Sequence, residues 1–477
     1  MRFLGNILSK DEQVRIHNQS LQILSEVGVK YHGERSLDIL ERHGAKVDWD
    51  TRIARISPGL VERALQTVPK SFVLQARNPA YDYPLPSPVS RYGMDGTSAF
   101  AVDFDTGEKR YGTCKDIEKA MRVLQQLDMA VLAWAPTCAS DVPSNSRALH
   151  EFFTMAKFCS KHGQHELHRV DQVPYLVAGL KAIMGGEAEL KARKAFSLIY
   201  CPVAPLVHDG QMLDAYLELG AYEMPVMIMP MPVTGTTGPA SLFANICLAN
   251  AEALSGIVIY QLAHPGRHLI YSSATGSVDF RTGGYLGGTP EMGLMSAALT
   301  VMGRFYNLPS SSAGCTSDAK EPGPEAVLEK MITTLPAVLS GADIIIGIGE
   351  IESDQTLILE QIVVDNQIAH YCQRLADGID SSEGKDLFDD ILQVGPAGHF
   401  LKARSTRQAA RSNEFLTPEI IDRHTFDSWT TLGKPSMYTS ARGKVIDILA
   451  APPMDALPEA VLRELDEILN AADKEIQ

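Results

Sequence analysis

The chain has 477 residues, of which 45% are hydrophobic, and its 58 acidic and 43 basic residues give a net charge of -15. This excess of negative charge disfavours nucleic acid as a partner, because phosphate binding needs a basic face. No segment has the roughly 20 uninterrupted apolar residues of a membrane span, and the N-terminal sequence MRFLGNILSKDEQ lacks the apolar run of a signal peptide. The seven cysteines include no CxxC pair, which disfavours a disulfide framework. We therefore expect a cytoplasmic protein that contacts neither nucleic acid nor membrane.

The first 114 residues are predicted to form two small units ahead of the main domain. Residues 1–85 have the pattern of a helical unit: SKDE at 9–12 has the spacing of a capping box, and SP at 57–58 is typical of a helix start. Residues 86–114 are predicted as a β-hairpin, because the turn sequence DTG at 105–107 lies between two alternating runs.

From residue 115 to residue 450, short apolar runs alternate with helical patterns, as in a chain of βα units. Seven runs are predicted as parallel strands: Met129–Ala135, Glu166–Val170, Phe196–Pro202, Pro225–Pro230, His268–Ser273, Pro309–Cys315 and Asp343–Ile348. With an eighth strand near residues 390–402, this rhythm predicts an α/β fold, the TIM (β/α)8 barrel. An open doubly wound sheet is the alternative. Residues 451–477 are predicted as an exposed, charged C-terminal helix.

In such a barrel the active site lies at the C-terminal ends of the strands. His208 follows the third predicted run and is a candidate for binding substrate. Thr234, Gly235, Thr236 and Thr237 follow the fourth, where the sequence GTTGP can present backbone N–H groups and hydroxyls at a helix N-terminus to an anion such as a carboxylate. The alternative is a tight turn that only begins a helix.

Acidic and aromatic residues follow the later strands. The segment GEIESDQT at 349–356 holds three acids that can face a cation, above all Glu352, and Asp318 lies in the loop after the preceding strand. Glu352 and Asp318 are therefore the catalytic candidates. Phe280 and Tyr285, in the longest glycine-rich loop, can bind a quaternary ammonium group by cation–π contact. The alternatives are structural: acids favoured by a helix dipole, and aromatic rings that only pack.

No metal or cofactor site is predicted in this chain. His162, His165 and His168 have the spacing of metal ligands, but side chains alternate along a strand, so His165 and His168 would face opposite ways. The chain has no P-loop, HExxH or GxSxG motif, and no DxHxxG segment that could hold a corrinoid. The sequence IIIGIGEIES at 344–353 matches the glycine-rich turn of S-adenosylmethionine enzymes only faintly. Any cobalt must therefore come on another protein.

Five segments together carry a resemblance to a known family. They are LQILSEVGVKY (21–31), VDFRTGGYLGGTPEMG (278–293), AGCTSDAKEPGPEAVLEK (313–330), GEIESDQTLILEQIVVDNQI (349–368) and FDSWTTLGKPSMYTSARGKVIDIL (426–449). Over nearly its whole length the chain resembles the trimethylamine methyltransferase family. The resemblance implies a TIM barrel and methyl transfer to a separate corrinoid protein, with a later step to tetrahydrofolate or coenzyme M.

One departure from that family bears on the substrate. Its methanogen members use pyrrolysine, which this sequence lacks; we place the corresponding position in the loop Thr316–Glu321. Members without pyrrolysine are associated with quaternary amines such as glycine betaine, carnitine and proline betaine. The resemblance therefore implies a quaternary amine rather than trimethylamine.

The chemistry of a quaternary amine fits this expectation. Its nitrogen is already positively charged and leaves as a neutral tertiary amine, so the protein needs only to orient the N–CH₃ bond and exclude water. Two alternatives remain: an S-adenosylmethionine-dependent methyltransferase on an open sheet, and a non-catalytic protein that binds a betaine or docks a corrinoid protein. We also expect the chain to form a homo-oligomer.

Overall fold

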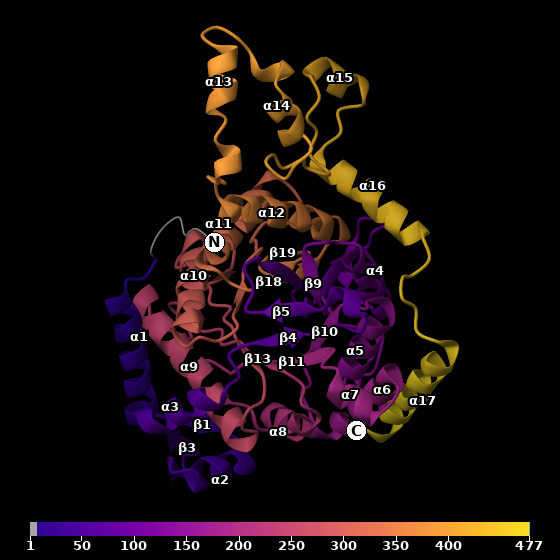
Figure 1. Cartoon of the computed structure of the whole chain (residues 1–477). Coiled ribbons are helices and arrows are strands. Elements are labelled where there is room, and N and C mark those ends of the chain that lie inside the picture. The colour runs from indigo at the N-terminus through magenta and orange to yellow at the C-terminus, as the bar shows by residue number, and fades with distance from the viewer. Residues whose placement is uncertain (1–6, 477) are drawn as a thin grey trace.

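The computed structural model describes residues 7–476, so six residues of the predicted N-terminal unit and the last residue of the predicted C-terminal helix lie outside it. Its centre is an eight-stranded parallel sheet in the order β14-β13-β11-β10-β9-β6-β18-β17 (Figure 1). A parallel bridge between Tyr271 and Ser310 joins the two end strands, so the sheet closes into a TIM barrel. The strands are β6 Arg91–Met94, β9 Ala130–Trp134, β10 His162–His165, β11 Phe196–Tyr200, β13 Val226–Ile228, β14 Leu269–Tyr271, β17 Ser311–Ala313 and β18 Ile344–Ile348.

Six of the seven predicted strand runs coincide with barrel strands. The seventh run and the predicted position of the eighth strand are both wrong. The run Glu166–Val170 is not a strand, because the chain pairs four residues earlier, as β10. No barrel strand lies near 390–402; the remaining strand is β6, the first in the chain, which lies inside the segment predicted as a hairpin. The closed barrel rules out the open-sheet alternative.

Helices follow the strands and cover the outside of the barrel (Figure 1). They are α4 Cys114–Gln125, α5 Arg147–Phe158, α6 Val173–Met184, α7 Glu187–Ala192, α8 Gly210–Leu219, α9 Leu242–Ala263, α10 Pro290–Phe305, α11 Pro324–Ser340 and α12 Leu359–Asp377. By length and composition α9 could cross a membrane, but 83% of its apolar stretch is buried inside the protein. It is therefore best described as a core helix, which the barrel covers on one side and the N-terminal unit on the other.

The N-terminal unit confirms both predicted helix starts. In the capping box before α1, the backbone N–H of Glu12 donates to Ser9 Oγ at 3.2 Å and that of Ser9 donates to the Glu12 carboxylate at 2.8 Å. Ser57 caps α3, with Pro58 at its first position. Both helices pack against α9. The unit is not purely helical as predicted: besides α2 it contains β1, β2 and β3, which form a four-stranded sheet with β12 from the loop after β11. The bounds are α1 Lys10–Gln22, α2 Glu34–Arg42, α3 Pro58–Thr67, β1 Val29–Tyr31, β2 Lys46–Asp48, β3 Ile53–Arg55 and β12 Val207–His208.

Small β-ribbons lie at the two ends of the barrel. The predicted hairpin is confirmed as β7 and β8, and it pairs with the segment after β18 to make a sheet in the order β19-β20-β7-β8. A second hairpin, β15 with β16, lies in the loop after β14, and β4 pairs with β5 ahead of the barrel. The bounds are β4 Phe72–Leu74, β5 Tyr83–Leu85, β7 Phe100–Val102, β8 Lys109–Tyr111, β15 Ser277–Val278, β16 Tyr285–Leu286, β19 Glu350–Ile351 and β20 Thr356–Leu357.

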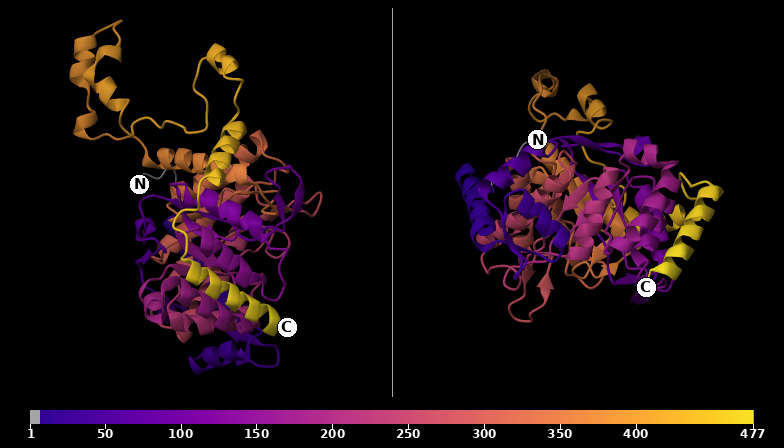
Figure 2. Two further views of the ribbon diagram at one scale, coloured as in Figure 1. Left: turned by 90° about the vertical axis from the view of Figure 1, so that its right-hand side faces the viewer. Right: turned by 90° about the horizontal axis from the view of Figure 1, so that it is seen from below.

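The C-terminal part leaves the barrel and returns to it (Figure 2). Residues 379–436, which we call the arm, project from the barrel and contain α13, α14 and α15. Then α16 packs against α12 and α4, and α17 packs against α6, with Leu465 and Leu469 buried. The predicted C-terminal helix therefore has a buried face as well as an exposed one. The bounds are α13 Phe388–Val394, α14 Arg404–Ala409, α15 Phe426–Thr431, α16 Met437–Ala450 and α17 Glu459–Glu475.

Candidate active site

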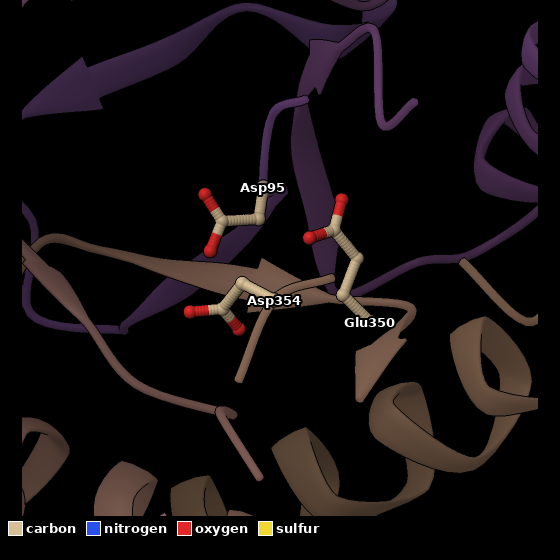
Figure 3. Close-up of side chains that lie close together, drawn as sticks. All are labelled: Asp95, Glu350 and Asp354. Carbon is tan, nitrogen blue, oxygen red and sulfur yellow. The ribbon is translucent and has the colours of Figure 1, made fainter. Parts of the chain in front are cut away.

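Three carboxyl groups meet at the C-terminal end of the barrel strands (Figure 3). Asp95 follows β6 directly, and Glu350 and Asp354 follow β18. One oxygen from each lies within 4.8 Å of the other two, and Glu350 is fully buried. Among the described residues, neither Glu350 oxygen nor Asp354 Oδ1 has a hydrogen-bond partner. These three residues are the acid cluster, and their free oxygens make it a candidate site for a cation.

Burial and mutual repulsion raise the pKa values of the acid cluster. Burial raises the pKa of Asp95 to about 6, although the N–H of Gly96 opposes the shift. Burial also raises the pKa of Glu350 well above its usual range, and the charges of Asp95 and Asp354 add to the effect. The pKa of Asp354 rises for the same reasons. The cluster therefore exchanges protons at a higher pH than ordinary carboxyl groups, and a bound cation would favour its ionised form.

Trp134 lies against Gly96, the residue that follows Asp95 of the acid cluster. Trp134 ends β9 and is 1% exposed, and its indole N–H has no partner among the described residues. A Cβ atom on Gly96 would lie 2.1 Å from that indole nitrogen, so only glycine fits after Asp95. A fourth carboxylate, Glu166 after β10, accepts a hydrogen bond from the Thr97 hydroxyl at 3.1 Å and raises the pKa of Asp95.

Tyr285 and Asp318 contact the loop that carries Asp354. The Ser353 hydroxyl, next to Asp354, donates to the Tyr285 carbonyl at 3.4 Å, which places Tyr285 beside the loop that carries Asp354. Tyr285 as a whole is 37% exposed, but desolvation of its phenol, and then the charges of Asp354, Asp95 and Asp318, raise the pKa of that group. Asp318 Oδ1 accepts hydrogen bonds from the Gly287 N–H at 2.8 Å and from the Ser353 hydroxyl at 2.7 Å. Asp318 therefore ties the loop after β14 to the loop after β18.

A buried ion pair supports the backbone beneath the cluster. Lys330 of α11 and Asp365 of α12 are both fully buried, with Nζ and Oδ2 2.9 Å apart. Lys330 also donates to the carbonyls of Cys315 and Gly347, and Asp365 accepts from the Gly349 N–H at 2.8 Å. These contacts fix the ends of β17 and β18, and the charge of Lys330 lowers the pKa values of all three cluster residues.

Glu352, the main acidic candidate from the sequence, is not part of the acid cluster. Its carboxylate forms an ion pair with Lys109 of β8 and accepts a hydrogen bond from Thr356 at 2.6 Å. These contacts lower its pKa, although burial opposes them. Since its charge is already neutralised, Glu352 joins the hairpin to the loop after β18, and the geometry favours its neighbours Glu350 and Asp354 as the partners of a cation.

The Thr234–Thr237 turn does not have the predicted relation to a helix. The helix α9 begins at Leu242 and is capped by Ser241, so the turn is not its N-terminus. Most N–H groups of the turn are also used: that of Thr234 donates to Gly276, that of Gly235 to Gly238, and that of Thr236 to Val233. The Thr237 hydroxyl accepts from Val233 N–H at 2.9 Å. The predicted position of the turn at a helix N-terminus is therefore wrong, and the binding of an anion by the turn stays a prediction.

The remaining candidates are His208 and Phe280. His208 is buried between the rings of Tyr31 and Tyr200, and its two nitrogens bond to the Tyr200 and Ser255 hydroxyls, each at 2.8 Å. Burial lowers its pKa to about 3, so it is a neutral structural residue that joins the N-terminal unit to the barrel. Phe280 is 76% exposed and lies over Gly235 of the turn. The structure thus brings Tyr285 and Asp318 to the acid cluster and leaves His208 outside it.

Comparison with known proteins agrees with this architecture. The family model described as trimethylamine methyltransferase (MTTB) matches residues 4–476. The chain belongs to the trimethylamine methyltransferase family. It is 32% identical to trimethylamine methyltransferase MttB of Methanosarcina barkeri, over 98% of this chain and 95% of that protein. It is 29% identical to a glycine betaine methyltransferase of Desulfitobacterium hafniense, over 98% of this chain and 96% of that protein.

The solved structures support the fold of this family member independently. The monomethylamine methyltransferase (MtmB) of Methanosarcina barkeri aligns with a TM-score of 0.51 over 94% of this chain and 90% of that one, at 13% sequence identity. At this sequence identity the likeness shows the fold alone. With the family match, it establishes that the chain is a methyltransferase with a TIM barrel.

Sequence reasoning missed Asp95, Trp134 and Glu166 in this methyltransferase. Asp95 follows a strand that was not recognised, and it meets Glu350 only because β6 pairs with β18. The position of a single acid directly after a barrel strand is the one signal that could have found it. Carboxylate oxygens also suit Mg²⁺ or Ca²⁺, so the acid cluster could hold either a metal ion or an organic cation.

Proposed function

We propose that this methyltransferase removes a methyl group from a quaternary ammonium compound and transfers it to the cobalt(I) of a separate corrinoid protein. The observation that carries the proposal is the acid cluster: three carboxyl groups at the barrel end, one oxygen of each within 4.8 Å of the other two. Both Glu350 oxygens and Asp354 Oδ1 have no hydrogen-bond partner among the described residues. A quaternary ammonium group has no N–H to donate, so it needs charge and surrounding surface rather than hydrogen-bond acceptors in fixed directions. Unbonded carboxylates beside Tyr285 and Trp134 supply both.

The reaction requires orientation more than acid–base chemistry from this chain. The N–CH₃ bond breaks, its electron pair stays on nitrogen, and a neutral tertiary amine leaves without taking a proton. The partner's corrinoid supplies the nucleophile that accepts the methyl group. The residues of this chain hold the ammonium, point one methyl group out of the barrel and exclude water. Because the charge on nitrogen disappears during transfer, the acid cluster must bind the cation only moderately, or it would slow the step.

Within this class we propose a betaine such as glycine betaine, carnitine or proline betaine. The similarity to a glycine betaine methyltransferase over 98% of the chain supports this choice. The absence of pyrrolysine from the sequence supports it as well. Since the N–H groups of Thr234, Gly235 and Thr236 are used internally, the proposal places recognition at the ammonium end and assigns no carboxylate site to that turn.

The test is a demethylation assay with the reduced cognate corrinoid protein. We expect turnover with at least one betaine and much slower turnover with trimethylamine. Faster reaction with trimethylamine would overturn the substrate class, and methylation that needs only S-adenosylmethionine would overturn the donor. Binding of a betaine without turnover, in the presence of an active corrinoid protein, would instead support a non-catalytic binding protein.

A further inference from the structure

The arm lacks a core of its own. Of residues 379–436, all of which the structure describes, only Ile420 is buried. None of its three helices buries a residue, and ten large apolar side chains of the arm are exposed. On α13, Phe388 is 60% and Leu392 is 65% exposed, and Leu401 before α14 is 77% exposed. An apolar surface of this extent, held away from the barrel (Figure 2), is typical of a protein–protein contact.

The charges of the arm are divided between its two outer segments. Residues 380–390 carry five acidic residues and one lysine, whereas residues 402–411 carry four basic residues and no acid. The four bases, together with Gln408, line a hollow of about 450 Å³. Among the described residues, none of the bases forms an ion pair, and neither do Glu383, Asp386 or Asp389 of the acidic segment. The arm thus presents two surfaces of equal and opposite net charge.

The arm keeps these two segments in a fixed relation to each other. The Ser405 hydroxyl donates to Asp390, which joins α14 to α13, and Lys385 forms an ion pair with Glu414. The base of the arm is attached to α12, where the Gln367 side chain accepts from the Glu419 N–H at 2.7 Å. The unpaired charges and apolar side chains of the outer arm therefore remain available to another molecule.

We propose that the arm binds a second copy of this chain in a two-fold pairing. Residues 380–390 of each copy lie on residues 402–411 of the other. A two-fold contact is self-complementary, so each acidic-to-basic contact is made twice. Equal and opposite charges on one arm are complementary to those of a second identical arm, which is why we choose this partner. The exposed apolar side chains of α13 then become the centre of an interface rimmed by ion pairs.

Mass measurement by sedimentation or light scattering tests this pairing with the full chain. In the first variant, Lys402→Glu, Arg404→Glu and Arg407→Glu make both outer segments acidic. We expect the native chain to be a dimer, or an assembly built from dimers, at micromolar concentration. We expect the variant to lose that pairing, so that its mass falls about twofold, while its melting temperature shows that the barrel stays folded.

The reciprocal variant makes the test specific. Glu383→Lys, Asp386→Lys and Asp389→Lys make both outer segments basic, and this protein is also expected to dissociate. Mixing the two variants restores both contacts, because the acidic arm of one meets the basic arm of the other. The native mass should therefore return only in the mixture.

A matched control changes the same charge elsewhere. Lys10→Glu, Arg42→Glu and Lys46→Glu alter exposed residues of the N-terminal unit and should leave the mass unchanged. The proposal is overturned if the native chain is a monomer, if both arm variants keep the native mass, or if their mixture stays dissociated. It is also overturned if the control dissociates as the arm variants do.

Discussion

At the scale of single residues, the acid cluster can carry three negative charges when it is ionised, and both Glu350 oxygens and Asp354 Oδ1 have no hydrogen-bond partner among the described residues. Replacing Glu350 by Gln keeps its shape and removes one of these charges. A close, desolvated charge contact contributes about 1.5–3 kcal/mol, so affinity for a quaternary ammonium ligand should fall roughly ten- to a hundredfold. Titration calorimetry with glycine betaine and with tetramethylammonium measures this change.

The neighbouring Glu352→Gln variant is the matched control for Glu350→Gln. It makes the same chemical change two residues away, but Glu352 already forms an ion pair with Lys109. We expect its affinity to stay within about twofold of the native value, because Glu352 is not part of the acid cluster. If Glu352→Gln weakens binding and Glu350→Gln does not, the cation site lies outside the acid cluster.

The raised pKa values of the acid cluster also predict a pH dependence. The pKa of Asp95 rises from about 3.9 in an unfolded chain to about 6, so the folded protein holds this proton more tightly. The stabilisation of the folded protein by protonated Asp95 is fully present below pH ~3.9 and is lost as the pH rises through about 6. A bound quaternary cation favours the ionised carboxylates and should offset this loss.

Thermal denaturation between pH 5 and pH 8 measures this effect. The rise in melting temperature caused by a saturating quaternary amine should be larger at pH 8 than at pH 5. In an Asp95→Asn variant the difference between the two pH values should shrink. A ligand-induced shift that is equal at both pH values, or larger at pH 5, contradicts the proposed role of these carboxyl groups.

The sequence could point to only part of this residue set. Glu350 and Asp354 were visible as neighbours of Glu352, but which of three closely spaced acids faces inward depends on the turn after β18, where residues 352–354 all have positive φ. Such left-handed backbone is rare outside glycine and is not signalled by the residue types. Asp95 follows the first barrel strand and Glu350 follows the last, so the two residues are far apart in the sequence and no local pattern could connect them.

At the scale of elements, the Lys330–Asp365 pair holds α11 and α12 to the ends of two strands. Replacing Lys330 by Met leaves a fully buried carboxylate without its partner. Loss of one member of a buried pair costs about 3–5 kcal/mol, so urea denaturation should show a fall of that size in the free energy of unfolding. Lys109→Met breaks a partly exposed pair and should cost no more than about 1 kcal/mol. Equal effects would mean that the buried pair adds no special support.

Element prediction succeeded where a local signal decides the structure. The caps at Ser9 and Ser57 and the hairpin turn after Val102 depend on a few adjacent residues, and all three were confirmed. The strand β10 was missed because its sequence, HGQH, is polar inside the barrel. There His162 bonds to the Gln75 carbonyl and the Ser197 hydroxyl, contacts that only the closed barrel supplies. The strand β6 was missed because it is short and contains glycine.

At the scale of the whole molecule, the acid cluster has two possible classes of occupant. We expect purified protein to be colourless and free of stoichiometric cobalt and zinc, and its turnover with the corrinoid protein to survive treatment with a chelator. Elemental analysis before and after EDTA dialysis, with the activity measured at each stage, checks this expectation. A divalent metal at one equivalent whose removal stops turnover would assign the three carboxyl groups to that metal instead.

The closure of the barrel sets the order in which the molecule can be completed during synthesis. The first barrel strand, β6, pairs with the last, β18, and the N-terminal unit packs on α9. The strand β6 and the N-terminal unit are therefore synthesised long before the elements that they contact. At about 5–20 residues per second, this interval lasts tens of seconds on the ribosome. Throughout it, the apolar faces of α1 and α3 stay uncovered. The nascent chain should therefore depend strongly on chaperones until α9 emerges, although the finished fold buries those faces fully.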